Sequence, residues 1–475
     1  MGTFTPEGTY RAAEEKLVHL RDLGATMIEL MPVAAFDGAR GWGYDGVSHF
    51  APFAPYGTPD ELCAFIDHAH ALGMRVILDV VYNHFGPSGN YLSCYSEAYF
   101  TSKYQNAWGD APDFTSPIMR RHVLDNVRYW LSQFRFDGLR LDATPTLFDP
   151  SPKHILREIA DLAPAIGPGK VIIAEDDRND PAVMTDLGMS AVWADDFHHQ
   201  IHVTLTGERD GYYRGFEPGA AGVARTINEG WLFTGQHYAP RDEDRGKPAN
   251  GVRADQLVYC LQNHDQVGNR ALGERLSALV PQEAYAAVSM LLLFLPMTPL
   301  LFMGQEWACR DPFLYFTDHD PDLGQKIREG RRNEFRAFTA FSDPAARDEI
   351  PDPQAMETFT RSRLDWDAIE DRDHRMMLSL YRNLLLLRRS DPILQHASRD
   401  GLHAEAEGPV LRVERRIEGE SRVLLVNLSA NAAPCGALLP DPKAVELMLA
   451  NRPGAWVSSK LGPYEAWLLA TRATE

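Results

Sequence analysis

The chain has 475 residues, of which 44% are hydrophobic and 24% are charged, and its formal net charge is -19. This length allows one large domain and an accessory domain, and the composition is typical of a folded globular protein. The negative charge disfavours nucleic acid and anionic membrane surfaces as partners, because both repel an acidic protein.

Cysteine usage and the first residues bear on the cellular compartment. The five cysteines are scattered and show no CxxC or Cys/His ligand spacing, which disfavours a disulfide framework or a zinc site. The first sixteen residues lack the basic-then-apolar pattern of a signal peptide. Both observations favour a reducing, cytoplasmic location.

One apolar stretch, 286–303, is long enough to span a bilayer. Pro296 and Pro299 interrupt it, however, and polar residues follow at once. We therefore expect a buried helix, a proline turn and a buried strand here, and no membrane segment.

Short apolar runs alternate with helical segments from the N-terminus to about residue 304. The first helical segment ends at Gly24, and Thr58 and Glu61 have the spacing of a capping box before the next helix. The expected strands are 25–32, a weaker one at 43–50, 74–84, 135–143, 170–175, 190–196, 255–265 and 298–304. Eight such strands separated by helices predict an α/β fold, a closed (β/α)₈ TIM barrel. An open doubly wound sheet is disfavoured, because no glycine-rich phosphate turn follows the first strand.

Two long connections and a change of pattern complete the predicted organisation. The segment 85–116 is too long for a simple loop and is rich in aromatic residues, which favours a short lid subdomain after strand 3. A second long loop, 231–254, is expected at the same mouth. After about Ser390 short alternating runs indicate an antiparallel β domain. The predicted domains are a catalytic barrel, 1–390, and a C-terminal β-sandwich domain, 391–475.

Polar side chains follow four of the expected strands at their carboxyl ends, the face where barrel enzymes place their active sites. They are Asp79, Asn83 and His84, then Arg140 and Asp142, then Glu175, and finally His264 and Asp265. Arg140 and Asp142 are two residues apart, so both point to the same side of their strand.

Three carboxylates that converge with an arginine and histidines, and without a cysteine, suggest glycoside chemistry. Retaining hydrolysis needs one ionised carboxylate as nucleophile and one protonated carboxyl as acid, about 5–5.5 Å apart. A neighbouring arginine keeps the first group ionised, whereas like charge and burial raise the pKa of the second. Aromatic side chains could stack on sugar faces; the candidates are Trp42, Tyr44, Tyr82 and Trp108.

At these residues the sequence resembles the α-amylase family of glycoside hydrolases. The stretches "DVVYNH", "GLRLDA", "IAED" and "QNHD" are similar, in order and spacing, to the four signature regions of that family. The resemblance implies three catalytic acids: Asp142 as nucleophile, Glu175 as general acid/base and Asp265 as the acid that holds sugar hydroxyls. It also implies supporting roles, namely Arg140 orienting Asp142, Asp79 fixing Arg140, and His84 and His264 holding the sugar at the cleavage point.

Further stretches of the sequence resemble one branch of that family; they include "GTFTPEGTY", "GWGYDGV", "AEDDRND" and "WADDFHH". Enzymes of this branch hydrolyse the α-1,4 bond next to the terminal trehalose of maltooligosyltrehalose and release trehalose. They usually carry a β-sandwich before the barrel, which is not seen before the first barrel helix here. An α-amylase or a glucan-branching enzyme is the alternative, because the core acids are common to all of them. A catalytically dead glucan-binding barrel is disfavoured, because all three acids are present.

Several loop residues have two possible roles. We expect Tyr44, Trp42 and Asp176 to contact substrate, although Trp42 could instead pack in the core and Asp176 could lie in a solvated acidic run. Asp195 and Asp196 are left open between substrate contact and a structural role. Asn83 matches a calcium ligand of many α-amylases, but with a short lid we expect no metal and no cofactor.

Overall fold

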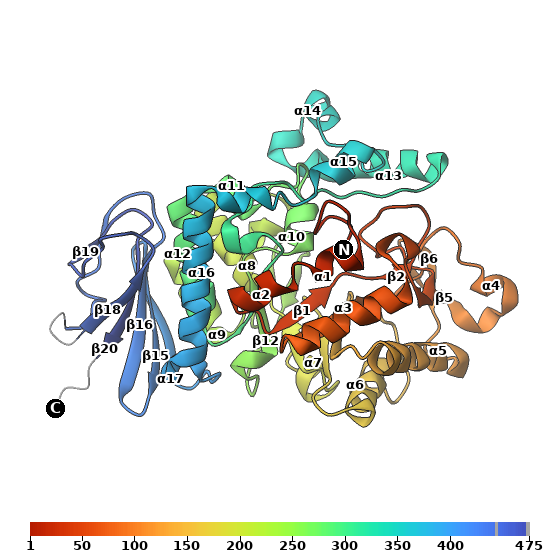
Figure 1. The fold of residues 1–475 in the computed structure, drawn as a ribbon, viewed down its shortest axis with the longest axis horizontal. Helices are drawn as coiled ribbons and strands as arrows, with labels where there is room; N and C mark the ends of the chain where they lie inside the picture. Colours follow the sequence, from red (N-terminus) through yellow and green to blue (C-terminus); the bar gives the residue numbers. More distant parts are fainter. Residues whose placement is uncertain (442–444, 472–475) are drawn as a thin grey trace.

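The computed structural model describes residues 1–441 and 445–471. Its centre is one parallel sheet, in which the strand order is β1-β4-β7-β8-β9-β12-β13. These seven strands are β1 (Met27–Leu30), β4 (Arg75–Val80), β7 (Gly138–Leu141), β8 (Val171–Glu175), β9 (Ala191–Trp193), β12 (Leu257–Cys260) and β13 (Thr298–Leu300). The strands are mostly apolar because helices cover the sheet (Figure 1). The sheet confirms the predicted barrel type of fold.

Helices follow most of the strands and cover the sheet. They are α1 (Tyr10–Glu14), α2 (Leu17–Leu23), α3 (Pro59–Ala71), α5 (Pro117–Arg128), α6 (Ile155–Ile166), α7 (Ala182–Thr185), α8 (Asp196–Thr206), α9 (Ala220–Glu229), α10 (His264–Gly268), α11 (Leu276–Leu279), α12 (Gln282–Phe294), α16 (Arg372–Ser390) and α17 (Pro392–Gln395). As predicted, α2 ends at Gly24, whose φ of 107° suits glycine, and Thr58 and Glu61 form a capping box before α3.

The weak strand expected at 43–50 is wrong as a barrel strand. The strand that forms there, β3 (Ser48–Pro52), pairs antiparallel with β2 (Ala34–Ala35), outside the parallel sheet. Ser48 and Phe50 are exposed, so this segment lacks the continuous apolar run that burial on both faces requires. Consequently the lid follows the second strand of the described parallel sheet, β4, rather than a third.

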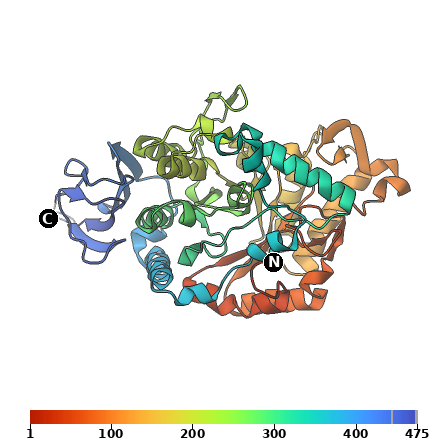
Figure 2. The ribbon, with the colours of Figure 1, turned by 90° about the horizontal axis from the view of Figure 1, so that it is seen from above.

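The lid and the second mouth loop both contain short hairpins. The lid consists of α4 (Leu92–Tyr95) and the antiparallel pair β5 (Phe100–Asn106) and β6 (Gly109–Pro112). The loop 231–254 carries β10 (Gln236–Tyr238) and β11 (Glu243–Arg245). Seen from above, the lid lies at one end of the molecule and the C-terminal sheet at the other (Figure 2).

The C-terminal segment forms an antiparallel sheet with the order β14-β15-β16-β20-β18, as predicted. Its strands are β14 (Leu402–Glu407), β15 (Val410–Ile417), β16 (Glu420–Asn427), β18 (Val445–Ala450) and β20 (Ala466–Thr471), and a small second sheet pairs β17 (Ala433–Pro434) with β19 (Lys460–Leu461). Helix α16 lies between this sheet and the barrel (Figure 1). Arg415 on β15 donates a hydrogen bond to the backbone oxygen of Phe294 on α12, which ties the two parts together. The domain boundary at residue 390 stays a prediction.

Between β13 and α16 the chain forms three further helices at the edge of the barrel. They are α13 (Pro321–Glu334), α14 (Pro344–Asp348) and α15 (Met356–Arg361). The apolar stretch 286–303 forms the predicted buried helix, part of α12, and the predicted strand β13, which is half-buried rather than buried. Pro296 lies between the two elements and Pro299 lies within β13. Among the described residues, no helix has both the length and the apolar character needed to cross a membrane.

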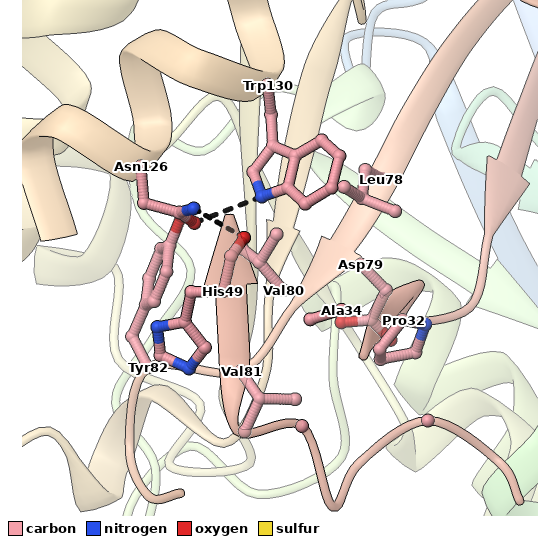
Figure 3. A pocket seen from close by; sticks show the side chains of 12 residues that line it. Pro32, Ala34, His49, Leu78, Asp79, Val80, Val81, Tyr82, Asn126 and Trp130 are labelled. Carbon is pink, nitrogen blue, oxygen red and sulfur yellow. Dashed lines mark hydrogen bonds between the residues drawn. The ribbon is translucent and has the colours of Figure 1, made fainter. Parts of the chain in front are cut away.

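A small cavity lies beside the buried strand β4 (Figure 3). Asn126 lines this cavity and connects two of its other lining residues. The Asn126 amide donates to the backbone oxygen of His49, and the Asn126 side-chain oxygen accepts from the indole of Trp130. The cavity volume is about 10 Å³, which is room for one water and not for a sugar. Asp79 is one of the residues that line it.

Candidate active site

Arg140 lies at the centre of the site, fully buried at the carboxyl end of β7. Its guanidinium contacts three carboxylates: Asp79 at 2.8 Å, Asp142 at 3.0 Å and Glu175 at 2.8 Å. The parallel register explains this convergence, because Asp79 on β4 is the direct neighbour of Arg140 and β8 is the next strand. The ring of Trp193 lies 4.3 Å from the guanidinium carbon and covers its other side.

Asp142 is held by donors on two sides. Besides Arg140, the amide of Asn83 donates hydrogen bonds to the carboxylate of Asp142 at 2.8 Å and to its backbone oxygen at 3.0 Å. The side chain is 13% exposed, so it is fixed and yet accessible. Charged and neutral donors together hold the carboxylate in one orientation, which suits a nucleophile.

Glu175 differs from Asp142 in its electrostatic surroundings. Burial raises its pKa well above the ordinary value; Arg140 opposes this shift, whereas Asp142 and Asp265 reinforce it. The backbone N–H of Ala143 donates to the carboxylate at 2.8 Å and orients it. A carboxyl whose pKa is raised in this way, next to a second carboxylate, has the properties of a general acid.

Asp265 and His264 begin helix α10, directly after β12. The hydroxyl of Tyr44 donates to Asp79 at 2.5 Å and lies 2.6 Å from Nε2 of His264. Because the hydroxyl has a single proton, Nε2 of His264 must donate to the Tyr44 oxygen. The Asp265 side chain is 31% exposed, and the amide of Asn269 donates to it at 3.2 Å. Its other oxygen lies 3.3 Å from Nε2 of His264, and the exposed part of the carboxylate can still accept from a sugar hydroxyl.

The lid contributes Trp108 to this site. Its ring stacks on the imidazole of His84, with the ring centroids 3.6 Å apart and the planes 10° from parallel. Nε2 of His84 in turn donates to the backbone oxygen of Tyr44 at 2.8 Å. Trp108 remains 45% exposed. The lid hairpin thus lies against the candidate sugar site, and its tryptophan retains surface for a ligand.

Two of the residues expected to contact substrate have little surface to offer. Trp42 is buried, stacked on Phe313, and its indole N–H donates to the backbone oxygen of Leu314. The carboxylate of Asp176 is buried and accepts from the hydroxyl of Thr144 and from Arg178. Both residues support the site without facing the substrate. Trp42 does so through an edge contact with the ring of His264. We do not propose a direct sugar contact for either residue.

The acidic run after Glu175 is paired with the second mouth loop. Asp177 forms an ion pair with Arg241, and Asp180 forms one with Lys247 at 2.6 Å. Local sequence patterns could not predict these pairs, because the basic partners lie more than 60 residues further along the chain. They hold the hairpin of β10 and β11 next to the candidate acid/base.

Sequence reasoning missed Trp193, which packs on Arg140, and left Asp195 undecided. Both stand at the carboxyl end of an expected strand, 190–196, so the rule that selected the other site residues also applied to them. Among the described residues no group of three or more His, Cys, Asp or Glu side chains could hold a metal ion. The Asn83 amide is turned toward Asp142 instead.

Comparison with known proteins identifies the family. Residues 3–113 match the model of the alpha amylase catalytic domain. The chain is 52% identical over 432 residues to malto-oligosyltrehalose trehalohydrolase of Deinococcus radiodurans, which covers 90% of this chain and 71% of that protein. The chain belongs to the malto-oligosyltrehalose trehalohydrolase family.

A more distant member of the trehalohydrolase family and a solved structure are also similar to this chain over most of its length. The enzyme of that name from Saccharolobus solfataricus is 42% identical, over 82% of this chain and 67% of its own length. A crystal structure of a Salmonella typhimurium protein described as an alpha amylase superposes with a TM-score of 0.91 at 38% identity, over 99% of this chain and 80% of that one. A glucan-branching enzyme of Nocardia farcinica is only 27% identical.

Proposed function

We propose that this protein is a retaining glycoside hydrolase that cleaves the α-1,4-glucosidic bond next to the terminal trehalose of maltooligosyltrehalose. The observation that carries the proposal is the convergence of Asp142, Glu175 and Asp79 on Arg140 at the carboxyl end of the sheet. The name shared by relatives 40–52% identical supports the choice of substrate.

In the first half of the reaction the carboxylate of Asp142 attacks the anomeric carbon of the glucose at the cleavage point. Glu175 donates its proton to the glycosidic oxygen, so that trehalose leaves as a neutral alcohol. The positive charge that develops on the sugar ring is stabilised by the carboxylates around it. Asp265 holds sugar hydroxyls, and His84 and His264 fix the ring.

In the second half Glu175 acts as a base. It removes a proton from a water molecule, which attacks the glycosyl–Asp142 bond and releases a shortened maltooligosaccharide. Arg140 stays ion-paired throughout, so the two carboxylates keep their separate roles while their protonation states change.

Product analysis tests the substrate choice. The wild-type chain is incubated in parallel with maltooligosyltrehalose and with a maltooligosaccharide of equal length, and the products are separated by chromatography. We expect trehalose release with a kcat/KM at least ~10-fold above that for the plain chain, because a site built for hydroxyls rejects a substrate that mispairs them. Equal efficiency on both would indicate an α-amylase, and a branched product would indicate a branching enzyme.

We further propose a cytoplasmic location, which fractionation of the native cells would test.

A further inference from the structure

Two adjacent aspartates, Asp195 and Asp196, follow β9 at the face of the sheet that carries the site. The structure gives them different surroundings. Asp196 is fully buried, and one oxygen accepts from the amide of Asn179 and from the backbone N–H groups of Leu232 and Phe233. Its other oxygen lies 2.9 Å from Arg245. Asp196 therefore anchors the second mouth loop and is not available to a ligand.

Asp195 occupies the N-cap position of α8, yet its side chain does not cap the helix. Its backbone has helical torsions, φ -63° and ψ -22°, whereas a capping aspartate normally has an extended backbone. Within the described part of the chain, no hydrogen bond or ion pair reaches its carboxylate. An aspartate at this position that forgoes an available helix cap is a departure from local preference, and such departures concentrate at functional sites.

The surroundings of Asp195 belong to the active site. The residue is partly buried, and its pKa is raised to about 7: burial is the main cause, the negative charges of Asp265, Asp196 and Asp177 act in the same direction, and Arg245 opposes them. Asp265 is the candidate sugar-binding acid, and Asp177 lies two residues after Glu175. A partly buried carboxyl without a protein partner is costly unless a ligand supplies one. A sugar hydroxyl suits it in either protonation state, because a hydroxyl both donates and accepts.

We propose that Asp195 hydrogen-bonds hydroxyls of the glucose unit on the leaving-group side and thereby contributes to the choice of trehalose. The side follows from the neighbouring strands: Glu175, which protonates the leaving group's oxygen, is the register partner of Trp193, two residues before Asp195. Asn179, in the segment after Glu175, donates to the adjacent Asp196. This inference rests on the proposed function.

The experiment compares Asp195→Asn with the wild type on two substrates. One is maltooligosyltrehalose; the other is an aryl α-maltooligoside, whose leaving group has no hydroxyls but whose donor sugars are unchanged. We expect kcat/KM for maltooligosyltrehalose to fall at least ~10-fold, because a site built to bind a hydroxyl loses strongly when one partner is impaired. The aryl substrate should change less than ~2-fold, since it makes no such contact.

Two controls separate the alternatives. Asp244→Asn removes one negative charge from an exposed position on the neighbouring hairpin and should leave both substrates unaffected. Asp195→Ser, smaller and neutral, serves if the asparagine variant does not fold. Equal losses on both substrates, or no loss on either, would overturn the role of Asp195. If the wild type itself releases no trehalose, the proposed function fails instead, and the two failures are thereby distinguished.

Discussion

Asn83 holds Asp142 by two hydrogen bonds, one to the carboxylate at 2.8 Å and one to the backbone oxygen at 3.0 Å. Asn83 follows β4 and Asp142 follows the neighbouring strand β7, so the sheet itself sets the distance between them. Together with Arg140, this amide fixes the carboxylate in one orientation. Preorganisation of this kind lets a nucleophile react without first reorienting.

Asp142→Asn is the direct test of the nucleophile. The substitution preserves shape and can retain a bond to Asn83, so we expect the fold and melting temperature to be kept. Activity should fall at least ~10³-fold, because an amide does not form the glycosyl ester. Initial rates on maltooligosyltrehalose measure this, with enzyme expressed free of the parent. Activity within tenfold of the parent would rule out Asp142 as nucleophile.

Glu175→Gln should lower activity much more on substrates with a poor leaving group than on substrates with a good one. A natural glucan needs its leaving oxygen protonated, whereas an activated aryl glycoside does not, so the variant should retain far more activity on the aryl substrate. Rates of glycosylation on both substrates measure this difference. A common loss on both would contradict the acid role.

The pH dependence of kcat/KM follows from the same carboxyl. The catalytically active form is protonated, and the pKa of Glu175 is raised by burial and by Asp142 and Asp265. Activity should therefore persist above the ordinary range of a glutamate and decline as pH rises through this raised pKa. In Glu175→Gln the alkaline decline should disappear for the aryl substrate. An unchanged alkaline limb would assign that limb to another group.

Arg245→Met should destabilise the protein by about 3–5 kcal/mol, because it leaves the buried Asp196 carboxylate without its charged partner. Arg241→Met is the matched control on the same hairpin: its pair with Asp177 is half exposed, so the cost should be about 0–1 kcal/mol. Denaturant unfolding of both variants measures the difference. Equal stabilities would show that the Asp196 pair does not hold the mouth loop.

Chelation should leave the enzyme unchanged. The Asn83 amide, which the sequence resemblance marks as the candidate calcium ligand, is turned toward Asp142. The carboxylates of the site contact Arg140 in place of a cation. Incubation with a strong chelator, followed by activity and melting measurements, tests this expectation. A loss that added calcium reverses would show that a metal supports the site.

The sequence by itself determined the parallel type of sheet and the charged residues that meet at Arg140. Continuous apolar runs identify buried strands, and a strand's side chains alternate, so Arg140 and Asp142 had to share a side. In parallel strands all carboxyl ends meet at one face, which brings together motifs separated by long stretches of chain. These are local rules, and one sequence is enough to apply them.

Only the tertiary structure decided the residues whose roles depend on distant partners. Trp42 and Trp108 both stood in expected mouth loops, but Trp42 packs against Phe313 and Trp108 lies on His84. Asp195 and Asp196 are adjacent, yet only Asp196 meets Arg245, some fifty residues away. Likewise, β3 pairs with β2 rather than joining the barrel. Such contacts depend on how long loops fold back over the sheet, because the energy that fixes them comes from packing and charge between segments and not from local propensity.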